Sequence, residues 1–295
     1  MSIDPNDSGL LYVVATPIGN RQDISLRAVE LLREVDLIAA EDTRHSARLM
    51  ESLGIATPLI SFHDFSSKQR LDALLQRLQS GKSLALVSDA GTPGIADPGY
   101  ELVRAARQVG IQVIPLPGPS AVIAALSVSG LPSDRFIFEG FLPARSRPRQ
   151  DRLGSLVDEQ RTMIFYESPH RIIACLEDFQ TIIGADRELF IARELTKRFE
   201  TTLLANVEEC LHWVCSDPQQ QKGEFVLVLA GMSKTRRKSG ELDEGLRILR
   251  LLEDDVPLKR AARLAADISG APRNALYRAA LQAADNDTGE NEADD

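Results

Sequence analysis

Two charged segments, each following an apolar run, carry the side chains best suited to proton transfer. They are YESPHR (166–171) and RELTKRFE (193–200). Together they offer acids, a histidine and cations, namely Glu167, His170, Arg171, Arg193, Glu194, Lys197 and Glu200. Such groups at strand ends can bind a polar substrate and move a proton. The sequence alone does not rank them.

A second feature is the turn SDAGTPGIADPG, residues 88–99, which holds three glycines and two prolines. Glycine lets a backbone approach a ligand closely, and proline stiffens the residues around it. A helix cap would use only one side chain, so capping does not explain the whole turn. We therefore predict a preorganised pocket lined by backbone. LPGPSA (116–121) repeats the pattern, with Ser120 as a plausible helix N-cap.

Two further loops allow both a functional and a structural interpretation. TPIGN (16–20) can present backbone N–H groups to an anion, or it can be a plain turn, because the G-x-G-x-x-G pattern is absent. In AEDTRH (40–45), Asp42 or Thr43 can cap a helix while Glu41 and Arg44 point into a cleft.

The elements that must position these loops follow from the hydrophobic pattern. Apolar runs at 11–15, 36–40, 58–62, 83–88 and 111–116 alternate with segments of helical period, which indicates a mostly parallel sheet. The loops above should share the rim at the carboxyl ends of its strands. A second series (FIFEGF, TMIFYE, ELFIARE, TTLLA, EFVLVLA) predicts a mixed sheet, and 242–284 has only helical periodicity. The expected division is a disordered 1–9, α/β domains at 10–117 and 118–232, a basic linker at 233–241, helices at 242–284 and a disordered acidic tail at 285–295.

Composition limits the class of protein. The chain has 295 residues, a net charge of −9 and three cysteines, with six acids in its last eleven residues. The cysteines cannot form a disulfide framework, and neither a membrane span nor a signal peptide is recognisable, so we expect a cytoplasmic protein with no membrane partner. Basic residues gather in PARSRPRQDR (143–152) and SKTRRK (233–238). These local clusters are compatible with an anionic partner despite the negative net charge.

Three other motifs are set aside. SGKS (80–83) follows a helix, so Gly81 is a helix C-cap rather than part of a phosphate loop. CLHWVC (210–215) has no fourth ligand in view, so no metal is expected, and G-x-S-x-G is absent. Residues 258–281 are spaced either as a helix-turn-helix, with Arg273, Asn274 and Arg278 facing phosphate, or as a small helical bundle.

The motifs TPIGN, AEDTR, SDAGTPGIADPG, PLPGPSA, FEGFLP, YESPHR, RELTKRFE and KGEFVLVLAG, in this order, closely resemble the ribosomal RNA small subunit methyltransferase I family. That family belongs to the tetrapyrrole methylase, or class III, superfamily. The resemblance runs from about residue 10 to about residue 281. It implies a homodimeric, two-domain α/β enzyme that uses S-adenosylmethionine to methylate the ribose 2′-hydroxyl of a cytidine in the decoding region of 16S ribosomal RNA. TPIGN departs from the G-x-G-P-G turn that is usual in tetrapyrrole methylases. The role of that turn in the porphyrinoid enzymes is therefore not assigned to TPIGN, and the departure fits a different substrate.

Expected site residues come both from the resemblance and from the motifs and basic segments themselves. The expected cofactor contacts are Pro17, Gly19, Ser88, Asp89, Ala90, Gly91, Thr92, Pro93, Gly94, Pro117, Gly118, Pro119, Ser120, Ala121, Tyr166 and Leu195. The expected RNA contacts are Arg44, Arg145, Arg147, Arg149, His170, Arg171, Arg273 and Arg278.

The candidates for the proton acceptor are Lys197, Glu194, Glu200, Glu167 and Glu41. Of these, Lys197 and Glu200 are favoured. Lysine can act as a base only if its pKa is lowered, and it would otherwise bind phosphate. Two alternatives stand beside this reading: a methyltransferase of the same fold acting on a tetrapyrrole, and a noncatalytic RNA-binding module.

Overall fold

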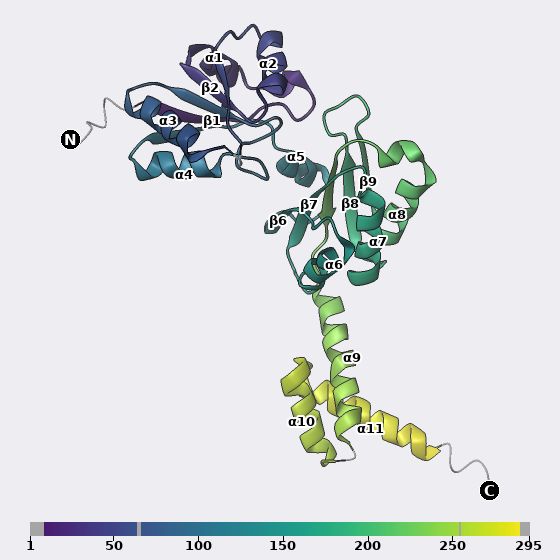
Figure 1. The fold of residues 1–295 in the computed structure, drawn as a ribbon. Coiled ribbons are helices and arrows are strands. Elements are labelled where there is room, and N and C mark those ends of the chain that lie inside the picture. Colours follow the sequence, from purple (N-terminus) through teal and green to yellow (C-terminus); the bar gives the residue numbers. More distant parts are fainter. Residues whose placement is uncertain (1–8, 64–65, 254, 290–295) are drawn as a thin grey trace. The chain divides into compact units, whose positions relative to one another are not determined.

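The structure is a computed structural model that describes residues 9–63, 66–253 and 255–289 (Figure 1). Its strands are β1 Leu10–Val14, β2 Leu37–Ala40, β3 Leu59–Ser61, β4 Leu84–Val87, β5 Gln112–Leu116, β6 Phe136–Phe141, β7 Thr162–Glu167, β8 Glu188–Arg193, β9 Thr201–Asn206 and β10 Phe225–Leu229. Its α-helices are α1 Leu26–Glu34, α2 Thr43–Ser52, α3 Lys68–Gln79, α4 Tyr100–Gln108, α5 Ala121–Val128, α6 Ser146–Gly154, α7 Ile172–Ile182, α8 Val207–Ser216, α9 Lys234–Leu252, α10 Leu258–Ser269 and α11 Arg273–Gly289.

The first sheet is parallel, with the order β3-β2-β4-β1-β5. Its central strands are apolar on both faces because each face is covered by helices. One core contains Leu11 and Leu84, and the other contains Val14 and Ile38. The predicted parallel α/β architecture is therefore confirmed, and the loops after β1, β2, β4 and β5 leave the same edge.

The second sheet is mixed, as predicted, with the order β6-β7-β10-β8-β9. β6 runs parallel to β7, whereas β10 is antiparallel to both β7 and β8. The first residue of β10, Phe225, pairs with the last residues of those two strands, Glu167 and Arg193. The start of β10 thus lies at the same edge as the ends of β7 and β8.

Side-chain caps set several helix starts. Asp42 accepts a hydrogen bond from the Arg44 amide at the start of α2, as the sequence indicated. Asn206 and Glu209 form a capping box on α8. Ser120 occupies the N-cap position of α5, but its hydroxyl makes no capping bond.

Both sheets belong to one compact unit, and residues 155–161 with those from 231 onward form a second. In the second unit, α9, α10 and α11 pack around Leu249, Ala261, Ala265 and Leu276. The expected basic linker at 233–241 is instead largely the start of α9, because its lysines and arginines favour helix and it contains no proline.

The expected disordered ends also differ in part. Gly9 is hydrogen-bonded to the Leu78 carbonyl, and α11 continues five residues beyond the predicted end of the helical segment, to Gly289. Residues 1–8 and 290–295 of those predicted ends lie outside the described residues. Among the described residues, no helix is long and apolar enough to cross a membrane.

Candidate active site

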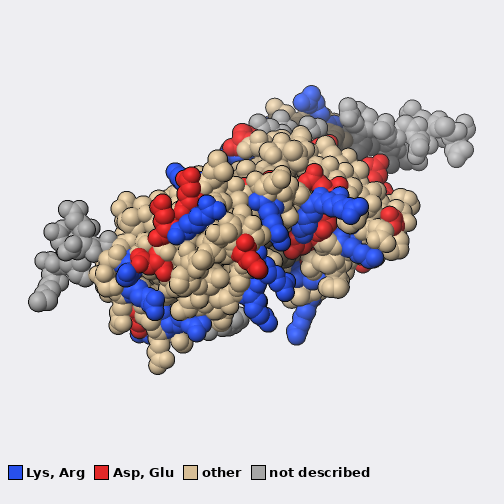
Figure 2. All heavy atoms as spheres, turned by 90° about the horizontal axis from the view of Figure 1, so that it is seen from above, with Lys and Arg blue, Asp and Glu red and all other residues tan. Residues whose placement is uncertain are grey.

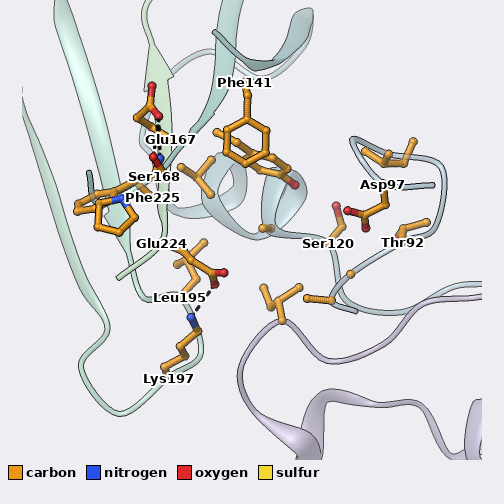
Figure 3. Close-up of a pocket in the computed structure, with 18 residues that line it drawn as sticks. Thr92, Asp97, Ser120, Phe141, Glu167, Ser168, Leu195, Lys197, Glu224 and Phe225 are labelled. Atoms are coloured by element: carbon orange, nitrogen blue, oxygen red, sulfur yellow. Dashed lines mark hydrogen bonds and ion pairs between the residues drawn. The ribbon is translucent and has the colours of Figure 1, made fainter. Parts of the chain in front are cut away.

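A cavity of about 320 Å³ lies between loops of the first sheet and the edge of the second sheet where β7 and β8 end and β10 begins (Figure 3). Its volume is within the range of small-molecule sites. Its walls combine apolar groups with a few polar ones: Ile18, Ala90, Gly91, Thr92, Ile95, Asp97, Ser120, Ala121, Phe141, Tyr166, Glu167, Ser168, Pro169, Leu195, Lys197, Glu224, Phe225 and Val226.

The glycine-rich turn after β4 is fixed by contacts to its neighbouring loops. Thr16 and Gly91 exchange two backbone hydrogen bonds of 2.8 and 3.0 Å. The hydroxyl of Thr92 donates to the Pro119 carbonyl at 3.2 Å. Gly91 has a φ of +83°, a conformation that side chains disfavour. The turn is therefore held as one rigid corner of the cavity, as its composition predicted.

Polar side chains lie on two sides of the cavity. Asp97, Thr92 and Ser120 lie on one side of the cavity, and Lys197 and Glu224 lie on the other (Figure 3). Burial, reinforced by the negative charge of Asp97, raises the pKa of Tyr166 to about 12. Tyr166 is therefore a neutral phenol at physiological pH. It can donate a hydrogen bond but does not act as a base.

Lys197 is held between two carboxylates. Its Nζ lies 2.8 Å from Glu194 Oε1 and 2.6 Å from Glu224 Oε2. Partial burial lowers the pKa of Lys197, but the two carboxylates outweigh burial and raise this pKa above its usual value. The interpretation of Lys197 as a general base is corrected on this point, because the base form needs a lowered pKa. Lys197 is an ammonium group in the cavity wall.

The loop that carries Lys197 has an unusual backbone. Glu194 and Thr196 adopt φ values of +53° and +64°, in the left-handed region that non-glycine residues rarely occupy. The Thr196 hydroxyl accepts a 3.0 Å hydrogen bond from the Asn20 amide of the loop after β1. A Cβ on Gly19 would lie 2.4 Å from the Lys197 Cγ. The glycine of TPIGN thus serves this close approach to Lys197.

The two other carboxylates of this loop have partners. Glu194 Oε1 also accepts a 3.0 Å hydrogen bond from the Glu224 amide. Burial raises the pKa of Glu194, but this bond and the contact with Lys197 outweigh burial, so the pKa is lowered. Glu200 accepts the Thr196 amide and does not line the cavity. Neither carboxylate faces the cavity, which removes the geometric basis for the roles predicted for them.

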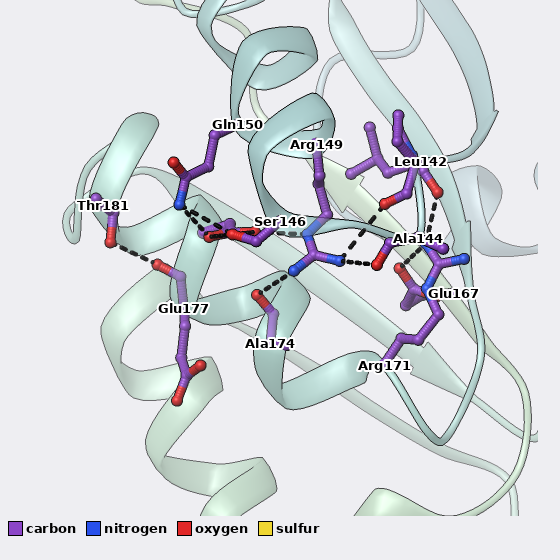
Figure 4. Close-up of polar contacts among 12 residues, drawn as sticks. Leu142, Ala144, Ser146, Arg149, Gln150, Glu167, Arg171, Ala174, Glu177 and Thr181 are labelled. Atoms are coloured by element: carbon purple, nitrogen blue, oxygen red, sulfur yellow. Dashed lines mark hydrogen bonds and ion pairs between the residues drawn. The ribbon is translucent and has the colours of Figure 1, made fainter.

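Glu167 lines the cavity, but its carboxylate is bound within the wall (Figure 4). Its side chain is fully buried; Oε1 accepts the Ser168 amide at 2.7 Å, and Oε2 accepts Arg171 Nη2 at 3.1 Å. Arg171 in turn donates to the Leu142 carbonyl. These contacts make both residues supports for the loop after β6 and leave Glu167 poorly placed to accept a substrate proton.

Arg149 is a clear correction to the predicted RNA contacts. It is 2% exposed, and its Nε lies 2.6 Å from Asp178 Oδ2 (Figure 4). Its other nitrogens donate to the carbonyls of Pro143, Ala144 and Ala174. A guanidinium buried this way ties α6 to α7 and cannot reach a phosphate in solvent.

The remaining predicted RNA contacts lie on the surface, away from the cavity lining. The exposed ones are Arg44, Arg145, Arg147, His170, Arg273 and Arg278. Arg44 pairs with Asp42 at 2.9 Å, and Arg147 with Asp151 at 3.3 Å. On the face drawn in Figure 2, Lys and Arg side chains lie among Asp and Glu side chains rather than in one continuous patch.

The predicted cofactor residues divide into two groups. Those in the cavity lining are Ala90, Gly91, Thr92, Ser120, Ala121, Tyr166 and Leu195. Those outside it are Pro17, Gly19, Ser88, Asp89, Pro93, Gly94, Pro117, Gly118 and Pro119. One member of the second group contacts the first directly, since the Pro119 carbonyl accepts the Thr92 hydroxyl at 3.2 Å. Two others contact the loop after β1: the Ser88 carbonyl accepts the Thr16 hydroxyl, and a Cβ on Gly118 would lie 3.0 Å from Ala15 Cβ.

Three lining residues with acidic or aromatic side chains are absent from the predicted site residues, namely Asp97, Phe141 and Glu224. Asp97 lies inside the turn that was singled out, and Phe141 and Glu224 lie in the quoted motifs FEGFLP and KGEFVLVLAG. Glu224 is 76% exposed at its side chain. It precedes a strand, whereas the sequence search considered residues that follow strands. Recognising that β10 is antiparallel would have placed it at the correct edge.

Comparison with known proteins gives the family. Residues 10–211 match the family described as Tetrapyrrole (Corrin/Porphyrin) Methylases, and residues 239–284 match the RsmI C-terminal HTH domain. The ribosomal RNA small subunit methyltransferase I of Pseudomonas aeruginosa is 52% identical over 275 residues, covering 93% of this chain and 98% of that protein.

Two solved structures share the fold. The methyltransferase CobJ has a TM-score of 0.56 at 20% identity, covering 76% of this chain and 95% of its own. Uroporphyrin-III C-methyltransferase from Thermus thermophilus, solved with S-adenyl homocysteine, has a TM-score of 0.52 at 16% identity, covering 75% and 97%. The chain therefore belongs to the ribosomal RNA small subunit methyltransferase I family of tetrapyrrole methylases, which are methyltransferases that use S-adenosylmethionine.

Proposed function

We propose that this protein transfers a methyl group from S-adenosylmethionine to the ribose 2′-hydroxyl of a cytidine in 16S ribosomal RNA. The observation that carries the proposal is the cavity, with a rigid glycine corner on one side and the Lys197–Glu224 pair on the other. The names of the relatives support RNA of the small subunit as the substrate. The ribose oxygen and the cytidine follow from the motif resemblance.

The residues present fit the methyl donor. Apolar walls at Ile18, Ile95 and Leu195 suit its hydrocarbon and adenine surfaces, while Asp97 suits its ribose hydroxyls or its positive charge. Gly91 lines the cavity without a side chain, and an added Cβ would lie 3.5 Å from Ile18 Cγ2. When bound, S-adenosylmethionine supplies a sulfonium methyl group that passes to the oxygen while the bonding electron pair stays on sulfur.

Glu224 is the proposed proton acceptor. A ribose hydroxyl is a weak nucleophile until its proton leaves, so a carboxylate within reach of the hydroxyl assists the transfer. Of the glutamates that line the cavity, Glu167 is bound to Ser168 and Arg171, whereas the exposed carboxylate of Glu224 contacts Lys197. The Lys197 ammonium holds this carboxylate in place, with Nζ 2.6 Å from Glu224 Oε2.

The first prediction concerns the glycine corner. Gly91→Ala is expected to weaken binding of S-adenosylmethionine roughly tenfold, because alanine disfavours the φ of +83° and the corner shifts. Isothermal titration calorimetry measures the change. Gly110→Ala is the matched control, since Gly110 has a φ of +81° and no atom within 4 Å of an added Cβ, yet lies outside the cavity. Equal donor affinity in the two variants would contradict the assignment of the corner.

The second prediction concerns the RNA surface. We expect affinity for 16S ribosomal RNA to fall with rising salt, because exposed arginines displace counterions from phosphates. Replacing both Arg145 and Arg147 by alanine should reduce the slope of log affinity against log salt by about 2. Binding measured at several salt concentrations tests this. An unchanged slope would remove these two residues from the interface.

The decisive test of the function is methylation of small subunits isolated from cells that lack the protein. Incubation with the purified protein and labelled S-adenosylmethionine should place one methyl group on a cytidine ribose, located by nuclease mapping and mass spectrometry. Label on a tetrapyrrole instead would favour the small-molecule alternative. Failure to bind the donor at all would favour a noncatalytic RNA-binding module.

The working form is proposed to be a cytoplasmic homodimer acting on the small subunit. Exposed apolar side chains on α5, Ile123 and Val128, support a covered surface there. The mass in solution, measured by light scattering, tests the dimer, and comparing free 16S RNA with assembled subunits tests the substrate form.

A further inference from the structure

Strand β6 contains a bulge immediately before the cavity. Phe138 pairs with Ile164 and Gly140 pairs with Phe165, so three residues of β6 lie opposite two residues of β7. Gly140 adopts a φ of +66°, which a glycine tolerates and which is typical of a bulge. The extra residue changes which face of the sheet the following side chain occupies.

The residue re-aimed by this bulge is Phe141. In a regular strand, side chains three positions apart lie on opposite faces. Here the rings of Phe138 and Phe141 both contact Tyr166, with centroid distances of 5.0 and 5.5 Å. The bulge therefore brings Phe141 onto the face of Tyr166 and into the cavity lining.

Phe141 combines exposure to solvent with a place in the cavity wall. The residue is 55% exposed although it lines the cavity. A T-shaped contact with the half-buried Tyr166 holds the Phe141 ring in this position. An aromatic ring that is held by a T-shaped contact and is more than half exposed can stack against another flat ring.

We propose that Phe141 is the platform on which the base of the target nucleotide stacks while its ribose faces Glu224. The inference rests on the proposed function and names the part of the substrate that the site holds. A nucleotide that reacts in an enclosed site must leave its helix, and an aromatic side chain compensates for the stacking it loses. Stacking tolerates any base, so Phe141 supplies affinity and placement, and the choice of cytidine is made elsewhere.

The main test replaces Phe141 by leucine and by tryptophan in the full-length protein. Undermethylated small subunits are the substrate, and KM, kcat and the calorimetric affinity for S-adenosylmethionine are measured. Leucine keeps an apolar side chain but cannot stack, so we expect KM for the subunit to rise about tenfold, with donor affinity within about twofold of wild type. Tryptophan should restore KM to within about threefold of wild type.

Phe136→Leu is the matched control, because Phe136 starts the same strand, is 38% exposed and does not line the cavity. It should leave KM unchanged. A tenfold loss of donor affinity in Phe141→Leu would overturn the proposal in favour of stacking with the donor's adenine. An unchanged KM, or equal effects of leucine and tryptophan, would also overturn it. Ribose methylation by the wild-type protein is measured in parallel, so failure of the proposed function is seen separately.

A second variant tests the bulge itself. Gly140→Ala adds a Cβ with no atom within 4 Å, so it acts only by disfavouring the backbone conformation of the bulge. The folded variant, checked by its melting curve, should reproduce the raised KM of Phe141→Leu. A folded Gly140→Ala protein with wild-type KM would show that the bulge does not position Phe141 for the substrate.

Discussion

Glu224→Gln is expected to slow methyl transfer by about 10²- to 10⁴-fold with both substrates saturating, which is the usual contribution of a general base. Glutamine keeps the size of the side chain and an oxygen that can accept from Lys197, but it cannot take up a proton. Affinity for S-adenosylmethionine should stay close to wild type, because Glu194 still holds Lys197 at 2.8 Å. Single-turnover rates with undermethylated small subunits measure the effect.

Two controls separate proton transfer from support of the loop. Glu208→Gln changes an exposed carboxylate in the first turn of α8, outside the cavity, and should leave the rate unchanged. The pH profile adds a second check. Because the pKa of Lys197 is raised above its ordinary value of 10.5, the ammonium persists through neutral and mildly alkaline pH. A rate that climbs as Lys197 loses its proton, or a wild-type rate in Glu224→Gln, would contradict the assignment.

Arg149→Ala is expected to lower the free energy of unfolding by about 3–5 kcal/mol, the usual cost of leaving one member of a buried ion pair without its partner. Asp178 would keep its contacts with Ser146 and Gln150 but lose the guanidinium at 2.6 Å. The carbonyls of Ala144 and Ala174 would also lose a donor. Urea unfolding followed by circular dichroism measures the loss.

The neighbouring Arg147 provides the control for this prediction. Its side chain is 86% exposed, so Arg147→Ala should change stability by less than about 0.5 kcal/mol. Acid should weaken the Arg149 effect. Burial raises the pKa of Asp178, but hydrogen bonds from Gln150, Arg149 and Ser146 outweigh it, and the pKa is lowered. The stabilisation is therefore present above the ordinary pKa of 3.8 and lost as the pH falls through the lower folded value. A stable Arg149→Ala protein with weakened RNA binding would restore the surface interpretation.

The pair Arg147 and Arg149 illustrates why the sequence identified basic segments but not their roles. Both lie in PARSRPRQDR, and composition treats them alike. On α6, however, Arg149 shares a face with Leu153, four residues later, and that face is buried. The helical period could have separated the two arginines. The partner Asp178, 29 positions away, could not have been identified without the fold.

The cavity was predicted in part. The composition of residues 88–99 predicted the rigid corner, because glycine and proline act on the backbone conformation at their own positions in the chain. The roles on the opposite wall depend on tertiary contacts. The pKa of Lys197 is set by Glu194 and Glu224, and Glu224 comes close only because β10 pairs antiparallel with β7 and β8. Phe141 is aimed by a bulge whose existence depends on pairing with β7.

The position of β10 also has a consequence for biosynthesis. It is the middle strand of its sheet but the last of the five to leave the ribosome, so β7 and β8 have no partner between them until residue 229 has emerged. A nascent or truncated chain that ends before Phe225 leaves two apolar strand edges open, which favours aggregation. Because Glu224 directly precedes β10, insertion of this last strand both completes the sheet and brings the proposed acceptor of the substrate proton to the cavity.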